Sequence, residues 1–288
     1  MDLRSPEALR AYVAEVVGTF LLVLFGTGAI ASAVLTGAQV GLWQVAVVWG
    51  FGITLAIYAT ASVSGAHLNP AVTLAIAIFR PEFPRHRVVG YWAAQLAGAI
   101  LAGLVVLATF GPFIDRFEEA AGLVRGEAGS QASAMVFGEY FPNPALFGTG
   151  REAQELVSPL AAAGVEALGT AVLVFMIFAL RDRRNPDGPG VLTPLLIGFT
   201  VAVLISLFAP ITQAGWNPAR DFGPRLVAFV AGWDSIAIPG PRSGFWVYIV
   251  GPLLGGPLGA AAYDYLVRTG LAAGEVEESG AVSDAIAE

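Results

Sequence analysis

Two copies of the tripeptide Asn-Pro-Ala, at Asn69-Pro70-Ala71 and Asn217-Pro218-Ala219, lie 148 residues apart, and each opens a short apolar run. Asparagine is a favoured N-cap, and proline suits the first helical position because its missing N–H would have no partner there. A side-chain amide held at such a helix end can donate hydrogen bonds to a hydroxyl oxygen. Two helix N-termini that meet also bring two partial positive charges together. The paired motif therefore indicates a site that favours neutral polar groups over cations.

Three charged residues stand where an apolar environment would penalise them. Arg220 directly follows the second motif, and an unpaired cation at the centre of a membrane helix costs at least about 2.5 kcal/mol. Glu15 and Glu166 open two similar segments, Glu-Val-Val-Gly-Thr and Glu-Ala-Leu-Gly-Thr, which lie 151 residues apart. A buried carboxylate must be paired or hydrogen-bonded. Because the two occupy equivalent places in a repeat, a scaffolding role is favoured over a proton relay, which is the alternative.

The composition places these residues in a membrane protein. Hydrophobic residues make up 56% of 288 positions, charged residues 13%, and the mean hydropathy is +0.70, which is too apolar for a soluble domain of this length. The lipid bilayer is the expected partner, and no nucleic acid is expected. The chain has no cysteine, and His67 and His86 lack metal-ligand companions, so no metal site is expected. Six stretches are long enough to span a bilayer: about 11–35, 42–62, 88–110, 160–180, 191–211 and 244–263.

The motif segments are too short to span. The runs 69–79 and 217–230 fall below the roughly 20 residues that a spanning helix needs, so each is predicted to form a half-helix. Non-helical chain at membrane depth is tolerated only when it is buried in protein or faces a water-filled cavity, so the segments before the half-helices should line one. A third copy, Asn143-Pro144-Ala145, has no adjoining apolar run and is interpreted as loop.

The order of the spans predicts an internal repeat. Residues 11–110 and 160–267 each contain span, span, half-helix and span, and since three full spans is an odd number, the second repeat is inverted. An external loop, 111–159, separates the repeats within one domain, 11–268. Nine arginines lie near span ends on the side of the termini against four on the other side. Both termini, 1–10 and an acidic disordered tail at 269–288, are therefore predicted to be cytoplasmic.

The segments Ser64–Thr73 and Gly215–Arg225 resemble the two signature loops of the aquaporin and glycerol-facilitator family, and the likeness covers about 11–268. The resemblance implies an all-α membrane protein with six transmembrane helices and two re-entrant half-helices in two inverted repeats. It also implies a passive channel, not an enzyme, that passes glycerol, similar small neutral solutes and water, and excludes protons and ions. A homotetramer in the cell membrane, without a cofactor, is implied as well.

The resemblance further implies a selectivity filter, in which loop carbonyls hold the arginine. Typical glycerol facilitators have glycine and phenylalanine where this chain has Ile205 and Ala214, and the combination found here is close to that of plant nodulin-26-like channels. Many water-selective members have a histidine in place of Ile205. The filter is therefore expected to be wider than a water filter. Its four members are implied to be Trp49, Ile205, Ala214 and Arg220.

Roles for the re-entrant loops also follow from the resemblance. Glu15 and Glu166 are implied to accept hydrogen bonds from backbone N–H groups of the two loops, and Gln95 to support the first loop. The loop carbonyls implied to accept hydrogen bonds from the solute are those of Gly65, Ala66, His67, Gln213, Ala214 and Gly215.

Several alternatives stay open at this point. A water-selective aquaporin has the same architecture, and inverted repeats also suit a coupled secondary transporter. An intramembrane hydrolase is a rival from another class. The spans lack a nucleophile with a histidine partner and a pair of aspartates, and Glu15 and Glu166 belong to opposite halves.

Overall fold

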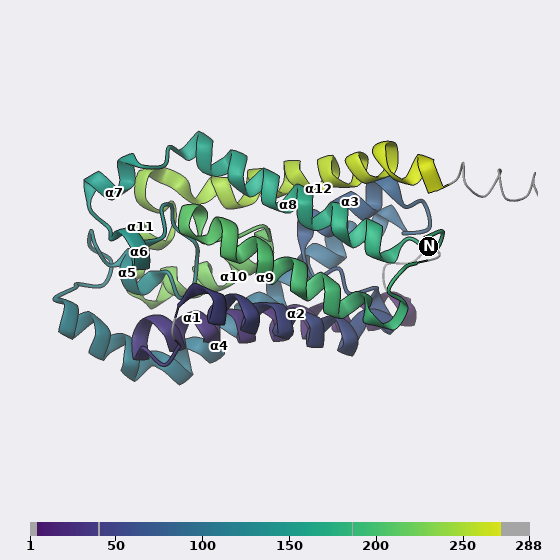
Figure 1. Cartoon of the computed structure of the whole chain (residues 1–288). Coiled ribbons are helices and arrows are strands. Elements are labelled where there is room, and N and C mark those ends of the chain that lie inside the picture. Colours follow the sequence, from purple (N-terminus) through teal and green to yellow (C-terminus); the bar gives the residue numbers. More distant parts are fainter. Residues whose placement is uncertain (1–4, 40, 186, 272–288) are drawn as a thin grey trace, which may run out of the picture.

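The computed structural model describes residues 5–39, 41–185 and 187–271, and all the regular structure within them is helical. Six helices are long and apolar enough to cross a membrane (Figure 1), which confirms the expected all-α membrane fold. The eight main helices are α1 (Pro6–Thr36), α2 (Leu42–Ser64), α3 (Pro70–Phe79), α4 (Val88–Ala121), α8 (Pro159–Arg181), α9 (Thr193–Thr212), α10 (Pro218–Ala228) and α12 (Val247–Leu266). Short helices are α5 (Gln131–Ala134), α6 (Pro144–Phe147), α7 (Arg151–Glu155) and α11 (Asp234–Ala237). Short 3₁₀ segments lie at Arg85–Arg87, Gly190–Leu192 and Pro241–Trp246, and a π-helical segment lies at Phe229–Trp233.

Local sequence explains where these helices begin. Ser5 and Ser158 cap α1 and α8 by accepting from the backbone N–H three residues on, and proline follows each serine. Asn69 caps α3 by accepting from the N–H of Ala71, and Asn217 caps α10 by accepting from those of Ala219 and Arg220; proline again follows each cap. The two half-helices therefore start at the predicted residues, with 10 and 11 helical residues respectively.

The helices pack as two similar sets. Helix α1 packs against α2 and α4, and α8 packs against α9 and α12, while α2 and α9 join the two sets. Glycines permit the closest crossings. A Cβ on Gly98 would lie 2.3 Å from the carbonyl oxygen of Val16 on α1, and one on Gly255 would lie 2.1 Å from that of Ala167 on α8. Small residues are favoured at membrane helix interfaces because they allow this approach.

The structure departs from the prediction most clearly at α4 and at Asn143. Helix α4 continues to Ala121 rather than ending near 110, because its last turns bury Ile114 and Glu118 against the loop that follows. Asn143, interpreted as loop, caps the one-turn helix α6, where its Oδ1 accepts from the N–H of Ala145 at 3.0 Å. Residues 1–4 and 272–288, parts of the predicted cytoplasmic termini, lie outside the described residues.

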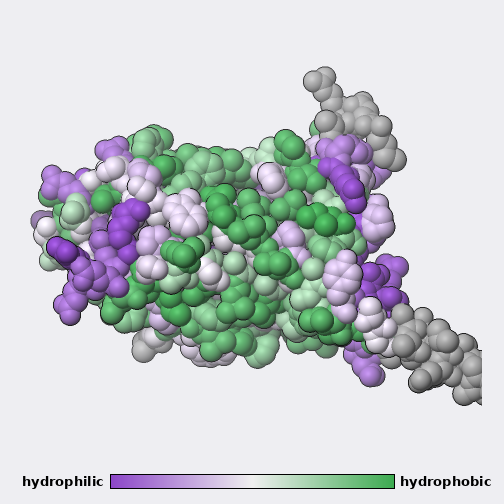
Figure 2. Space-filling view, turned by 90° about the horizontal axis from the view of Figure 1, so that it is seen from above, coloured by the Kyte–Doolittle hydropathy of each residue, from purple (hydrophilic) through white to green (hydrophobic). Residues whose placement is uncertain are grey.

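The molecule has two polar ends. Helix α1 begins and α12 finishes at one end, here called the termini end, while α5, α6, α7 and α11 form the other, the loop end (Figure 1). Figure 2 shows hydrophobic side chains along the face between these ends, with hydrophilic residues gathered at the ends themselves. Phe51, Leu207 and Leu254 are more than half exposed on their spans. Such a surface suits a hydrocarbon environment.

Candidate functional site: a channel between two half-helices

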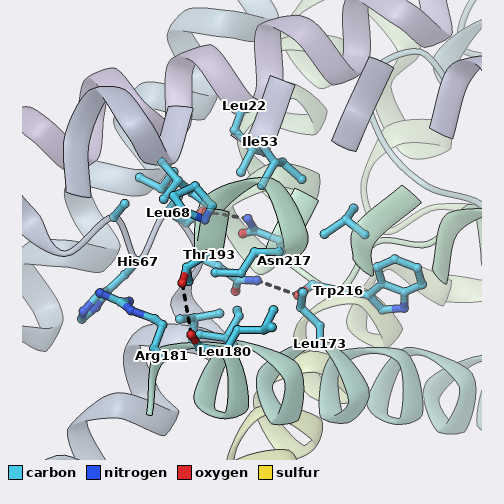
Figure 3. A pocket seen from close by; sticks show the side chains of 18 of the residues that line it. Leu22, Ile53, His67, Leu68, Leu173, Leu180, Arg181, Thr193, Trp216 and Asn217 are labelled. Carbon is cyan, nitrogen blue, oxygen red and sulfur yellow. Dashed lines mark hydrogen bonds between the residues drawn. The ribbon is translucent and has the colours of Figure 1, made fainter. Parts of the chain in front are cut away.

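The asparagines of the two motifs bind across the repeats. Asn69 donates through Nδ2 to the carbonyl of Trp216 at 2.9 Å, and Asn217 donates to the carbonyl of Leu68 at 2.8 Å (Figure 3). The amide oxygens accept from the first turn of their own half-helices, so each amide is held at both ends. An amide nitrogen carries two protons. The second proton of each asparagine is thus available to a solute at the point where the half-helices meet.

The loops before the half-helices have unusual backbone conformations. Ala66 and Leu68 have φ angles of 49° and 53°, and their counterparts Ala214 and Trp216 have 66° and 49°. Left-handed conformations are uncommon for residues other than glycine and cost of order 1–3 kcal/mol each. The surrounding structure must therefore hold these loops in place.

Glu15 is the centre of the first of these supports. Its Oε1 accepts from Ser64 Oγ at 2.6 Å and from the N–H of His67 at 2.9 Å. Its Oε2 accepts from the N–H of Leu68 and from Gln95 Nε2, both at 2.8 Å. The carboxylate is fully buried, so these four donors replace the water that it has lost.

Glu166 occupies the equivalent place in the second repeat. Its Oε1 and Oε2 accept from the N–H groups of Gly215 at 3.0 Å and Trp216 at 2.7 Å. It is also fully buried. Both carboxylates contact backbone of a re-entrant loop, a geometry that fits the predicted loop support. Loop support stays the prediction for both residues, and a proton relay stays the alternative.

Two cavities meet at the predicted filter residues. The channel cavity, of about 530 Å³, contains Asn69, Asn217 and Arg220 in its lining and extends to Arg181 at the termini end. The loop-end cavity, of about 510 Å³, lies on the other side, beside α6. Trp49, Ile205 and Gln213 line both, whereas Ala214 and Arg220 line the channel cavity.

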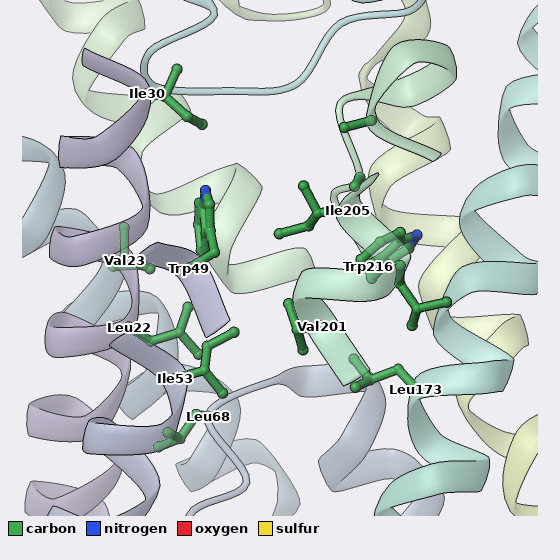
Figure 4. Packing of buried hydrophobic residues seen from close by; sticks show 14 of the residues in the cluster. Leu22, Val23, Ile30, Trp49, Ile53, Leu68, Leu173, Val201, Ile205 and Trp216 are labelled. Atoms are coloured by element: carbon green, nitrogen blue, oxygen red, sulfur yellow. The ribbon is translucent and has the colours of Figure 1, made fainter. Parts of the chain in front are cut away.

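Figure 4 shows the side chains of Trp49 and Ile205 facing one another from α2 and α9. The guanidinium of Arg220 lies 4.4 Å from the centre of the Trp49 ring, and the residue is 3% exposed. The structure thus brings an aromatic wall, an aliphatic wall and a cation together where the two cavities meet. An apolar wall opposite hydrogen-bond donors suits a solute with one carbon face and one hydroxyl face.

The support of Arg220 differs from the one that the resemblance implies. Its Nη2 forms an ion pair with Glu139, a buried residue of the external loop that is not among the predicted site residues. Asp221 and Arg225 hold Glu139 in turn: Asp221 Oδ1 accepts its N–H at 2.7 Å, and Arg225 donates to its carbonyl. The sequence does indicate that Arg220 has an acidic partner, because a buried arginine needs a counter-charge. It does not identify Glu139 as that partner, because the external loop contains several acids.

The predicted pore carbonyls divide into two groups. The residues that line the channel cavity are Ala66, His67, Gln213, Ala214 and Gly215. Gly65 does not line that cavity, and its carbonyl accepts from Arg181 Nη1 at 3.2 Å. The His67 ring packs between Phe83 and Tyr91, with ring centres 4.9 and 4.8 Å away. In the described part of the chain, no group of three histidine, cysteine or acidic side chains is placed to hold a metal.

Comparisons with known proteins agree with this architecture. The family model described as "Major intrinsic protein" matches residues 2–263. The glycerol uptake facilitator protein of Pseudomonas aeruginosa is 42% identical over 265 residues, which cover 91% of this chain and 90% of the relative. The propanediol uptake facilitator of Citrobacter freundii is 42% identical over 268 residues, covering 92% and 95%. The structure of the Plasmodium falciparum aquaglyceroporin matches with a TM-score of 0.77 and 24% identity over 91% of this chain and 98% of that one.

These relatives are facilitators and channels, which excludes the enzyme alternative. The family match spans both re-entrant loops and all but the last residues of α12. The chain belongs to the major intrinsic protein family.

Proposed function

We propose that the protein is a passive channel for glycerol and similar small neutral solutes, that it also conducts water, and that it excludes protons and ions. The observation that carries the proposal is that apolar side chains and a hydrogen-bond donor lie together at the filter. Trp49 and Ile205 offer apolar surface to a carbon chain, while Arg220 stands 4.4 Å from the Trp49 ring with donors for hydroxyl groups. Water needs only the hydrogen-bond donors, so the apolar walls favour a solute that has a carbon face as well as hydroxyl groups.

The hydrogen-bonding path supports the same proposal. A hydroxyl that leaves the filter meets the second amide proton of Asn217 and then that of Asn69, with loop carbonyls as acceptors beside them. Exchange of water partners for these groups avoids the cost of burying an unsatisfied hydroxyl. Two half-helix N-termini, each equivalent to roughly half a positive charge, repel cations at the same point.

The names of the relatives suggest a class of substrates. Two facilitators at 42% identity are named for glycerol and propanediol, which both carry hydroxyls along one edge of a short carbon chain. We therefore place short-chain diols and triols first among the solutes. We also propose that the protein lies in a cell membrane with both termini cytoplasmic. The arginine distribution supports this orientation. Assembly as a homotetramer rests on the family resemblance.

Stopped-flow light scattering on proteoliposomes tests the proposal with gradients of glycerol, propanediol and sucrose, and a pH-sensitive dye reports proton leak. We expect rapid glycerol entry without proton current. Ala214→Phe places a ring in the constriction without the glycine that makes room in typical glycerol facilitators, so glycerol flux should fall well below water flux. Adding Ile205→Gly should restore it. Wild-type exclusion of glycerol with free passage of water would instead indicate a water-selective aquaporin.

A further inference from the structure

An arginine stands over the channel at the end opposite the filter. Arg181 is the last residue of α8, lines the channel cavity and donates to the carbonyl of Gly65 in the first re-entrant loop. Figure 3 shows its guanidinium beside His67. Arg220, the cation at the filter, has a carboxylate partner, whereas Arg181 contacts a neutral carbonyl. The Arg181 guanidinium at the channel mouth thus contacts a neutral acceptor, although an anion would give it a stronger, charge-assisted hydrogen bond.

A third cavity adjoins this mouth. This arginine chamber, of about 670 Å³, touches the channel cavity, because the two spaces share His67, Ile177, Arg181, Asp182 and Arg183 in their linings. Ile76, Phe83 and Phe178 add further apolar walls to the shared Ile177. Its charged lining consists of Arg80, Arg181, Arg183, Arg184, Arg268, Glu82 and Asp182.

Three of the five arginines have carboxylate partners. Arg80 binds Asp264 through two hydrogen bonds of 2.7 and 2.9 Å. Arg184 binds Asp182, and its hydrogen bonds hold the pKa of that carboxyl well below the usual range, so Asp182 stays ionised. Arg268 lies 3.4 Å from both of these carboxylates and shares them. These groups form the charge-paired part of the chamber lining.

The remaining two arginines are not paired in this way. Across residues 5–39, 41–185 and 187–271, no ion pair joins Arg181 or Arg183 to a carboxylate, and Glu82 is an exposed residue that forms none either. Arg181 and Arg183 both line the chamber and the channel cavity. Counted together with Glu82, Asp182 and Asp264, the five arginines leave two positive charges in excess.

We propose that the arginine chamber binds a small phosphate-bearing anion between Arg181 and Arg183, and that the bound anion slows solute passage at the termini end. Guanidinium groups match phosphate geometry and bind it through charge-assisted hydrogen bonds, which are roughly twice as strong as neutral ones. The anion therefore competes with the carbonyl of Gly65 for Arg181 and occupies the channel mouth. A phosphate monoester or inorganic phosphate fits best, because its two charges equal the excess.

Binding can be tested without any solute flux. The purified full chain is titrated in detergent with inorganic phosphate, and calorimetry follows the binding. We expect saturable binding in the wild type and at least a tenfold weaker affinity in Arg181→Gln/Arg183→Gln, with Arg183→Gln alone between them. Arg151→Gln removes an arginine that is 93% exposed at the loop end and should bind as the wild type does. Melting temperatures of all variants separate lost binding from lost folding.

Measurements of glycerol flux then test the effect of the bound anion on the channel. This part of the experiment alone rests on the proposed function. In neutral phosphatidylcholine vesicles with phosphate on both faces, glycerol flux should fall at least twofold relative to chloride of equal ionic strength. The double variant should show no such fall. Vesicles that contain phosphatidate but no soluble phosphate test a lipid headgroup as the source of the same monoester, and slowing there in the wild type alone would assign it to lipid. Absence of saturable binding, or equal binding by the double variant, would overturn the site even if glycerol conduction itself failed.

Discussion

At the scale of single residues, the filter depends on a charge pair that spans two distant parts of the chain. The Arg220 and Glu139 side chains are 4% and 0% exposed, and Asp221 and Arg225 fix the backbone of Glu139. The desolvation of both charges makes this pair costly to break, because the remaining charge would be buried alone. The position of Arg220 over Trp49 is therefore tied to the integrity of the external loop.

This pair gives the first prediction. Glu139→Gln keeps the side-chain volume but leaves the Arg220 cation unpaired, so we expect a loss of about 3 kcal/mol in the free energy of unfolding. The freed guanidinium should also move toward the aqueous channel and lower glycerol flux by roughly tenfold. Thermal unfolding in detergent and stopped-flow flux measure the two effects. Glu155→Gln is the control, since Glu155 is 66% exposed in an i,i+4 pair. Equal stability of the two variants would contradict the buried pair.

The sequence identified one member of the pair and missed the other for a physical reason. A cation directly after a half-helix motif is costly at membrane depth, so Arg220 could be selected from its position alone. Glu139 precedes it by 81 residues and is one of several acids in a polar loop, where nothing local distinguishes it. The same holds for Arg181, whose position over the channel depends on how α8 packs against the first re-entrant loop.

At the scale of elements, two buried carboxylates hold two strained loops. Glu166 binds the N–H groups of Gly215 and Trp216, and Trp216 has a φ of 49°. The half-helices themselves could be predicted because an asparagine cap followed by proline is a local signal. The length of α4 could not be predicted from such a local signal. Gly111 and Pro112 suggest a helix end, whereas the buried contacts of Ile114 and Glu118 continue the helix.

Replacing Glu166 tests the loop support. Glu166→Ala leaves two buried backbone donors without partners, at about 1–3 kcal/mol each, so the variant should unfold more easily by about 2–6 kcal/mol. Chemical unfolding of the purified protein measures this loss. Glu119→Ala removes an exposed acid and should change stability little. A Glu166→Ala protein with wild-type stability and no flux would instead favour the proton-relay or another direct transport role.

The glycine crossings give a third prediction. Gly255→Ala would place a Cβ 2.1 Å from a backbone oxygen of α8, so α12 must move away and melting should occur at a clearly lower temperature. Gly164→Ala is a matched control on α8, where a new Cβ meets nothing within 4 Å. Since alanine favours helix by up to about 1 kcal/mol, this variant should be at least as stable as the wild type. Identical melting of both would show that the α8 and α12 crossing tolerates separation.

At the scale of the whole molecule, the two polar ends differ in which side of the membrane they should face. The chain has no cysteine, so single cysteines can report the orientation without a modified background. His86→Cys lies at the termini end, near the ion pair of Arg87 with Glu7, and Arg151→Cys lies at the loop end. In intact cells, an impermeant maleimide should label Arg151→Cys at once and His86→Cys only after lysis. The reverse pattern would place the termini outside.

The reciprocal hydrogen bonds between the two Asn-Pro-Ala motifs have a consequence for how the sequence of such a chain can change. Asn69 binds the loop of the second repeat, and Asn217 binds the loop of the first, as matching patches do across a two-fold axis. The single chain therefore has the interface of a dimer of two oppositely inserted copies. A short ancestral unit that entered membranes in both directions would satisfy the same bonds before any fusion of its copies. In the fused chain each asparagine is held by the other half, so a change in one motif would leave a buried carbonyl of the other repeat without its donor.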